Sequence, residues 1–309
     1  MRSTGRPDSP YDFADLDFDR LWAGRGRTTA VERRVIAELL DRGDNRRLLE
    51  IGPGGGRIST LLLGRTMDYV GVDVTPRFLP RLKAHWPEQG IWIAGDLARL
   101  PIAAGSVSGA VVIRVYNFLV EPVGALRELN RVLASGGRVV LSYFPVPSVA
   151  TVWDDLRNSV RTGGPGPEGR RPNRPASAQL PTRAGFRATV AAAGFEVEGE
   201  AAVGFEDFRA FRWLPEGVFV GISHSFARTP LPPHRFVLLR KPGTPPASLL
   251  PLDQVLVCPR CREPLGPPDG AVLSNGRCPR CDRRWDGTDG VLDLRPRPGD
   301  FDAAPDPGI

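Results

Sequence analysis

Apolar residues in the first half of the chain follow two different periods. From about Thr29 they recur every three or four positions, which predicts an amphipathic helix. The apolar positions of this helix are Val31, Val35, Ile36, Leu39 and Leu40. Further on, short and largely apolar stretches occupy residues 48–51, 68–74, 91–96 and 110–115. Such stretches are typical of strands that are covered on both faces, so the pattern predicts an α/β fold with a doubly wound, mostly parallel sheet.

A glycine-rich turn follows the first apolar run. Glu50 and Ile51 precede it, and its residues are Gly52, Pro53, Gly54, Gly55 and Gly56. Glycines between a strand and a helix let backbone N–H groups approach a ligand where a Cβ would clash. Arg57 stands where the dinucleotide fingerprint has its third glycine, so the turn predicts a nucleotide-like cofactor of another kind. A tight turn that binds no ligand is the alternative.

Acidic residues lie at or near the carboxyl ends of three successive predicted strands. They are Glu50, Asp73 and Asp96. Open α/β sheets bind their ligands at this edge, and a carboxylate about twenty residues after the glycines can accept both hydroxyls of a ribose. Each residue by itself could equally be a solvated loop residue or a helix cap. Together they indicate a nucleoside site.

Four stretches of this region carry a family resemblance: residues 49–56, 71–73, 95–101 and 126–141. The first 240 or so residues resemble a class I S-adenosylmethionine-dependent methyltransferase, of the group that includes the ubiquinone and menaquinone C-methyltransferases. The resemblance implies a seven-stranded Rossmann-like sheet and S-adenosylmethionine as cofactor. It also implies that Glu50 and the glycine turn face the methionine part, Asp73 the ribose, and Asp96 with Leu97 the adenine.

Further candidate residues come from the same comparison with the family. Val74 and Arg114 join the predicted cofactor-binding set, and Arg114, Tyr116 and Asn117 follow the fourth strand, over the expected methyl position. Asn117 could orient a substrate group or cap the following loop. Tyr116 and Asn117 are candidate catalytic residues.

The remaining candidates lie in the part that should select the substrate. Residues 145–181 are rich in glycine, proline and arginine, which fits either a basic lid or a disordered loop. Residues 203–236 are rich in aromatic side chains that pack in the core or line an apolar pocket. His224 is the candidate base near that pocket, although a lone histidine is more often a packing residue. His85 and His234 are interpreted as peripheral.

Four cysteines form two C-x-x-C pairs near the other end of the chain, separated by sixteen residues. They are Cys258, Cys261, Cys278 and Cys281. This spacing predicts a four-thiolate zinc site that is structural, with disulfides or free thiols as the alternatives. The surrounding 45 or so residues resemble the small zinc-ribbon proteins that activate RNA and protein methyltransferases. A fused copy implies intramolecular docking on the methyltransferase part, or a platform for the substrate.

Composition adds few restrictions. The chain has 309 residues with a formal net charge of +6, which permits but does not require a polyanionic partner. Its first residues lead to no apolar segment, and no run approaches the length of a membrane span. We therefore expect a cytoplasmic protein without a secretory signal or a membrane segment.

These patterns divide the chain into successive segments. They are a disordered N-terminus (1–10), a methyltransferase domain (11–241) with the loop or lid at 145–181, a linker (242–251), a zinc ribbon (252–296) and a disordered tail (297–309). The predicted function is S-adenosylmethionine-dependent methylation of a small molecule or peptide. The alternatives are an RNA methyltransferase that uses the ribbon for recognition, and a catalytically silent scaffold. The methylated atom is left open among O, N, C and S.

Overall fold

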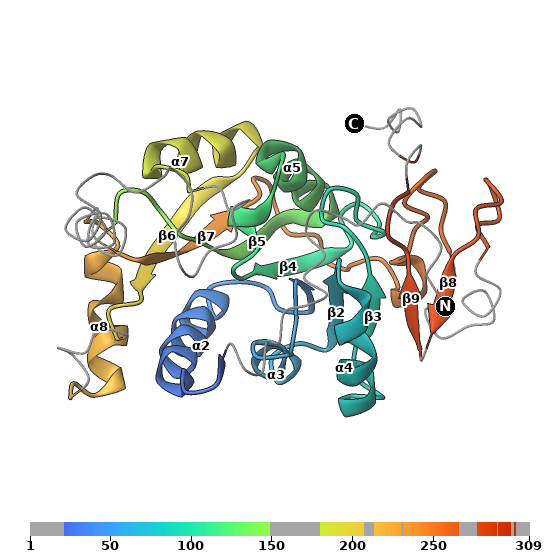
Figure 1. Ribbon diagram of the computed structural model, residues 1–309. Helices are drawn as coiled ribbons and strands as arrows, with labels where there is room; N and C mark the ends of the chain where they lie inside the picture. The colour runs from blue at the N-terminus through green and yellow to red at the C-terminus, as the bar shows by residue number, and fades with distance from the viewer. Residues whose placement is uncertain are drawn as a thin grey trace, which may run out of the picture.

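The structure is a computed structural model that describes residues 22–148, 180–206, 213–229, 232–265, 277–288, 290–297 and 300. A single mixed sheet forms its centre, with helices on both faces (Figure 1). The expected lid at 145–181 and the expected tail at 297–309 fall largely outside the described residues, and the expected segment 1–10 falls wholly outside them. No helix in the described part of the chain is long and apolar enough to cross a membrane.

The strands of the sheet are β1 (Arg47–Ile51), β2 (Asp68–Asp73), β3 (Ile91–Ala94), β4 (Val107–Val112), β5 (Leu133–Tyr143), β6 (Glu196–Val203), β7 (His234–Arg240), β8 (Asp286–Thr288) and β9 (Val291–Asp293). The α-helices are α2 (Gly26–Leu40), α3 (Ser59–Leu63), α4 (Leu79–His85), α5 (Pro122–Val132), α7 (Arg183–Ala192) and α8 (Glu216–Phe226). Short 3₁₀ helices are η1 (Pro76–Phe78), η2 (Tyr116–Phe118) and η4 (Leu252–Gln254). Helices α5 and α7 cover one face of the sheet, and α2, α3 and α4 cover the other (Figure 1).

The sheet has nine strands in the order β6-β7-β5-β4-β1-β2-β3-β9-β8. Strands β1 to β5 pair in parallel, whereas β7 is antiparallel to β5 and to β6. The first seven strands along the chain match the doubly wound, mostly parallel prediction. The predicted count of seven was wrong for the whole sheet, because the zinc-ribbon segment adds β9 in parallel to the edge strand β3 and β8 beyond it.

Helix α5 runs directly into strand β5. The helix ends at Val132 and the strand starts at Leu133, so both glycines of this segment lie inside β5. Gly136 has a φ of 72°, and a Cβ on it would lie 2.7 Å from the ring of Pro245. Glycine is required there because the linker passes directly over the strand.

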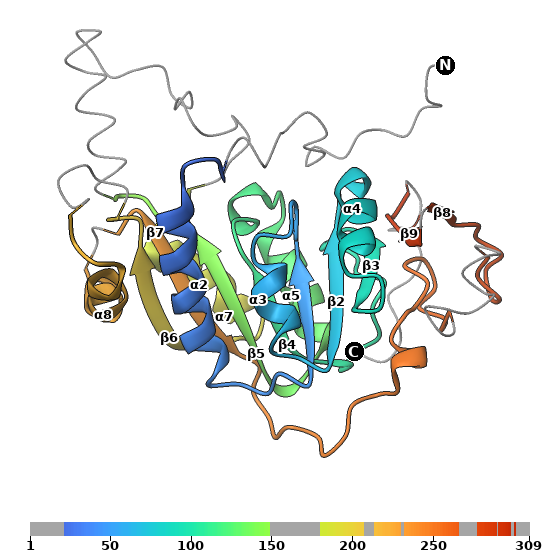
Figure 2. The same ribbon diagram turned by 90° about the horizontal axis from the view of Figure 1, so that it is seen from below.

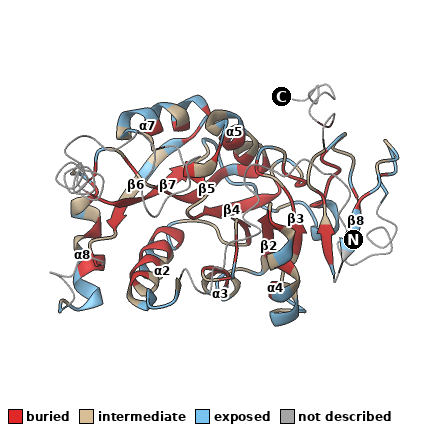
Figure 3. Ribbon diagram, in the orientation of Figure 1, coloured by how far each residue is buried: buried red, intermediate tan, exposed pale blue. Residues whose placement is uncertain are grey.

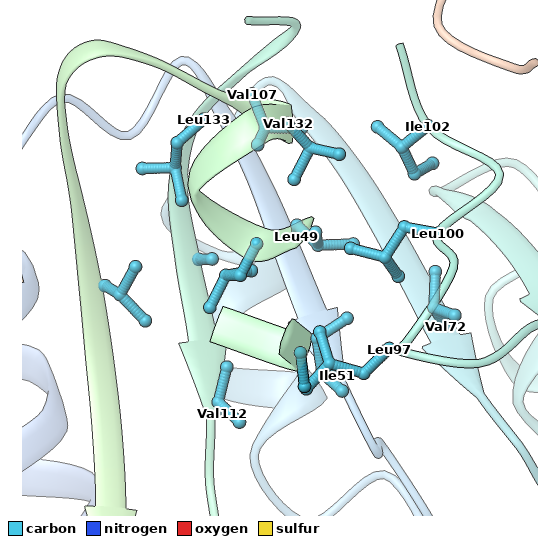
Figure 4. Close-up of a cluster of buried hydrophobic side chains, with 14 of the residues drawn as sticks. Leu49, Ile51, Val72, Leu97, Leu100, Ile102, Val107, Val112, Val132 and Leu133 are labelled. Carbon is cyan, nitrogen blue, oxygen red and sulfur yellow. The ribbon is translucent and has the colours of Figure 1, made fainter. Parts of the chain in front are cut away.

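Two layers of apolar side chains fill the space between the sheet and its helices, and strands β1 to β5 and β7 are buried along most of their length (Figure 3). Figure 4 shows part of the layer beneath α5, where Leu97 and Leu100 meet side chains from β1, β2 and β4. The same buried cluster includes Leu256, Trp285 and Leu292 of the ribbon segment. The segment expected to form a zinc ribbon therefore shares a hydrophobic core with the rest of the sheet.

Candidate functional site

The glycine turn and Asp73 form one hydrogen-bonded unit at the carboxyl edge of the sheet. The Asp73 carboxylate accepts hydrogen bonds from the backbone N–H groups of Gly54 and Thr75, both at 2.9 Å. Gly52 has a φ of 73°, and a Cβ on it would lie 2.7 Å from Val115. The turn thus needs glycine both for its left-handed backbone and for close contact with the end of β4. Asp73 is thus held in place by the turn that it closes.

Glu50 is a buried carboxyl group next to this unit. Its Oε2 accepts hydrogen bonds from the hydroxyls of Ser59, at 2.7 Å, and Tyr69. Burial raises the pKa of Glu50 to about 7, although both hydrogen bonds favour the ionised form. A carboxyl that ionises near neutral pH is suited to a cationic ligand group, which would favour the charged form.

Asp96 and Leu97 follow β3 along the same edge. The Asp96 carboxylate accepts from the N–H of Ala98 at 2.9 Å, and burial raises its pKa. Leu97 is buried. Because β1, β2 and β3 pair in parallel, Glu50, Asp73 and Asp96 all lie at one edge of the sheet, as the sequence analysis expected. Which atoms of a cofactor each of them would contact stays a prediction.

The three candidate catalytic residues do not lie together at this edge. The Asn117 amide donates to the carbonyl of Phe144 at 3.1 Å and accepts from its N–H at 2.8 Å, so it holds the segment after β5. Tyr116 is buried against Tyr143 and Phe186, beneath α7. His224 lies on α8, where its ring nitrogens are 3.1 Å from the Glu200 carbonyl and 3.4 Å from the Glu38 carboxylate.

A group of charged residues, of which the sequence analysis assigned only Arg114 to the site, lies at the same edge. We call it the Glu32 cluster, and it consists of Glu32, Arg57, Arg114 and His234. Glu32 on α2 has a fully buried side chain and pairs with Arg57 at 2.7 Å, with Arg114, and with His234 Nδ1 at 3.3 Å. The sequence contained one signal that could have revealed this cluster, because Glu32 stands next to Val31 on the apolar face of the predicted helix. Interpreting His234 as peripheral was wrong, because its ring is buried and stacks on Phe144.

The protonation states of the cluster follow from its contacts. Burial by itself would raise the pKa of Glu32, but Arg114, His234 and Arg57 outweigh it and hold that pKa far below its usual range. Burial and the charge of Arg114 lower the pKa of His234 to about 4. At neutral pH Glu32 is therefore ionised and His234 is neutral.

The four cysteines converge at the other end of the sheet. Their sulfur atoms all lie within 4.8 Å of one another, with 3.8 Å between Cys258 and Cys281 and 3.5 Å between Cys261 and Cys278. A tetrahedral zinc with Zn–S bonds of about 2.3 Å requires sulfur–sulfur separations of roughly 3.8 Å, so the residues fit the metal. The two knuckles repeat one geometry, since Arg262 and Asp282 both have a φ of 60° and donate to the carbonyls of Cys258 and Cys278.

The ribbon contacts the methyltransferase part next to Asp96. Leu294 N–H donates to the Ala94 carbonyl at 2.8 Å, and Val257 N–H donates to the Pro101 carbonyl at 3.0 Å. Arg262 adds hydrogen bonds to the Leu100 carbonyl, at 2.6 Å, and to Glu128, at 2.8 Å. Strands β8 and β9 lie beside β3 in both views of the molecule (Figures 1 and 2).

Comparison with known proteins agrees with this geometry. Residues 49–141 match the family model described as a methyltransferase domain. A methyltransferase of Mycobacterium tuberculosis strain H37Rv is 36% identical over 96 residues, which cover 31% of this chain and 39% of that protein. A demethylmenaquinone methyltransferase of Beutenbergia cavernae is 30% identical over 142 residues, which cover 46% of this chain and 55% of that protein.

Solved structures give the same fold. A chain from the complex between the Haloferax volcanii Trm112 methyltransferase activator and a methyltransferase superposes with a TM-score of 0.50 at 16% identity, covering 72% of this chain and 97% of that one. The fold is thus the Rossmann-like fold of S-adenosylmethionine-dependent methyltransferases. Residues 49–141 of this protein carry a methyltransferase domain.

Proposed function

We propose that the protein transfers the methyl group of S-adenosylmethionine to a small-molecule or peptide acceptor. The observation that carries this proposal is the set of carboxylates at the ends of three adjacent parallel strands, Glu50, Asp73 and Asp96, around a glycine turn. When bound, the cofactor supplies a methyl group that is already electrophilic because it is attached to a sulfonium.

The residues at the edge of the sheet have separate tasks in this proposal. Asp73 is oriented by two backbone N–H groups and would accept the ribose hydroxyls. Asp96 and Leu97 would contact the adenine. Glu50 would stabilise the positive charge of the methionine end, since its pKa places it close to ionisation. The protein then needs mainly to align the acceptor and exclude water, and a base only where the acceptor must lose a proton.

The test is calorimetry with S-adenosylhomocysteine on the wild type and Asp73→Asn. Loss of the charged acceptor should weaken binding by about 10- to 100-fold, the range for hydrogen bonds to a charged group. Asp44→Asn is the matched control, because Asp44 lies before β1, at the amino end of the strand, and bonds to Arg46. Wild-type protein that gives neither heat nor thermal stabilisation with this ligand would contradict the proposal and support the silent scaffold.

The choice of acceptor class rests on two lines of support. The aromatic residues of 203–236 are suited to an apolar acceptor, and the relatives include enzymes named for demethylmenaquinone. RNA is the alternative, supported by the net charge of +6 and by the ribbon. Incubation of small-molecule and RNA extracts with methyl-labelled cofactor, followed by mass spectrometry, separates them. RNA binding would also weaken steeply as salt increases.

We propose that the ribbon, with a structural zinc on its four cysteines, braces the adenine side of the cofactor site. Arg295 follows β9, pairs with Asp293 and donates to the carbonyl of Val74 at 3.4 Å. Val74 directly follows Asp73, and the ribbon also bonds to Ala94 and Pro101 on either side of Asp96. These contacts would keep both adenosine-contacting segments in place.

A further inference from the structure

The Glu32 cluster stands at the topological switch point of the sheet. Strands β1 and β4 are neighbours, while the chain leads from β1 toward β2 and from β4 toward β5 on opposite sides. Ligands of doubly wound sheets bind in the crevice outside the carboxyl ends of such a strand pair. Arg57 follows the glycine turn after β1, and Arg114 lies two residues beyond β4. Two guanidinium groups therefore stand where the methyl transfer is expected.

The charges of the cluster do not balance. Glu32 supplies one negative charge, Arg57 and Arg114 supply two positive charges, and His234 is neutral. The arginine side chains are only 16% and 24% exposed, so water screens the surplus cation poorly. Glu50, whose charge also acts on Arg57, has a pKa of about 7 and compensates this surplus only in part at neutral pH. Among the described residues the cluster thus keeps a positive surplus, and because buried charges are normally paired, that surplus is an indication of an anionic ligand.

Aromatic rings enclose the two guanidinium groups without supplying a hydrogen-bond acceptor to them. Trp22 lies 3.9 Å from Arg57 and 4.7 Å from Arg114, measured from ring centroid to guanidinium carbon, and Phe144 lies 5.1 Å from Arg114. Cation–π contacts of this kind lower the cost of burying the charge. Among the described residues, the buried Nε of Arg114 and Nε2 of His234 have no hydrogen-bond partner. Donor capacity is thus left over on Arg114, one of the two residues that share the surplus charge.

The backbone of Arg114 is a second, independent observation. Its φ is 61°, a left-handed conformation that costs energy for a residue with a Cβ. In the described part of the chain, the other non-glycine residues with positive φ are Arg262 and Asp282 of the zinc knuckles. The N–H of Arg114 donates to the Ser142 hydroxyl at 2.9 Å, which fixes this conformation. Strained residues of this kind collect at functional sites.

We propose that Arg57 and Arg114 form a carboxylate-binding site at the switch point, with Glu32 as the internal anchor that orients both side chains. A guanidinium matches a carboxylate because its N–H groups form a planar fork. The carboxylate belongs either to the methyl acceptor or to the methionine end of the cofactor. This inference rests on the proposed function, since it assumes that cofactor and acceptor meet at this edge.

Variants that still fold can distinguish ligand binding from a purely structural role of the cluster. Glu32 needs only one guanidinium to balance its charge, and Arg114→Gln leaves Arg57 in place at 2.7 Å. We therefore expect Arg114→Gln to fold with a thermal midpoint within a few degrees of the wild type. Arg57→Gln, which leaves Arg114 paired, is the second variant. Arg65→Gln is the matched control, because Arg65 is a more exposed arginine 3.9 Å from Asp41.

The first arm of the test compares two ligands by calorimetry: S-adenosylhomocysteine and S-adenosyl-3-thiopropylamine, which lacks the carboxylate. If the site binds the carboxylate of the cofactor, the wild type prefers S-adenosylhomocysteine by at least about 10-fold, as for a charge-assisted hydrogen bond. Arg114→Gln then loses the preference, and Arg65→Gln keeps it.

The second arm uses saturation-transfer NMR on protein saturated with S-adenosylhomocysteine, with phenylacetate and its neutral analogue phenylacetamide as probes. If the site binds an acceptor carboxylate, the wild type favours phenylacetate, and both cluster variants lose that preference. A carboxylate preference in either arm that the cluster variants abolish supports the proposal. No preference in either arm, or one that survives both variants, overturns it. Failure of S-adenosylhomocysteine to bind at all would instead refute the proposed function.

Discussion

Glu50→Gln should make the ligand-free protein more stable and lower its affinity for the cofactor. Glu50 is only 4% exposed, and its folded-state pKa is about 7, compared with 4.5 for an ordinary glutamate. Because the folded-state pKa is the higher one, the folded protein binds more protons than the unfolded chain between these pH values. The free energy of unfolding therefore decreases as pH rises through this window and levels off above about pH 7.

The size of the effect follows from the shift. A difference of about 2.5 pKa units corresponds to about 3 kcal/mol at 1.36 kcal/mol per unit. Glutamine stays neutral, and its side-chain oxygen can still accept hydrogen bonds from Ser59 and Tyr69. We expect the free energy of unfolding of Glu50→Gln to exceed that of the wild type by about 3 kcal/mol at pH 8 and by less than about 1 kcal/mol at pH 5.

Urea unfolding of the two ligand-free proteins at pH 5 and pH 8 measures this difference, and calorimetry with S-adenosylhomocysteine measures the loss of affinity. Glu128→Gln is the matched control, because Arg131 and Arg262 overcome the effect of burial and lower the pKa of Glu128. That substitution should destabilise the protein by nearly the same amount at pH 5 and pH 8, because both values lie above the ordinary glutamate pKa of 4.5. If Glu50→Gln is no more stable than the wild type at pH 8, or if its advantage is the same at both pH values, the reasoning about Glu50 is refuted.

Three further outcomes are expected. Asn117→Ala should lower the free energy of unfolding by about 1–3 kcal/mol, because it leaves the backbone groups of Phe144 unpaired. The dissociation constant of S-adenosylhomocysteine should stay unchanged. A loss of binding without a loss of stability would show that Asn117 acts in the binding site. Elemental analysis should find about one zinc per chain and clearly less in Cys281→Ser, whereas metal-free wild-type protein with four intact thiols would exclude the zinc site. Arg295→Ala should raise the KM for S-adenosylmethionine about 3- to 10-fold with kcat retained, because the substitution removes one hydrogen bond, the one to the Val74 carbonyl. Arg297→Ala is the control and should leave the KM unchanged, because among the described residues the Arg297 side chain pairs with Asp286 of the ribbon itself. Equal effects of the two substitutions would argue against the brace.

Several features were predictable because their signals are local in the chain. The buried strands show as largely apolar stretches, and the turn after β1 shows as closely spaced glycines. The parallel arrangement then brings Glu50, Asp73 and Asp96 to one edge without further information, since each lies within about two residues of the end of its own strand. The cysteine pairs are equally local, because a metal knuckle is closed by residues three positions apart.

Other features depend on contacts between residues far apart in the sequence. The pairing of β9 with β3 joins Leu292 to Ile93, and nothing in either short strand specifies the other as its partner. The Glu32 cluster likewise assembles side chains from α2, the turn after β1, the end of β4 and the start of β7. A glutamate on an apolar helix face indicates a buried charge, but only the packed structure shows which cations balance it. The chain by itself thus determined the sheet, the turn and the cysteine knuckles, whose signals lie within a few residues. Tertiary packing decided the nine-stranded sheet and the charged crevice, because long-range pairing depends on which surfaces meet once the elements have formed.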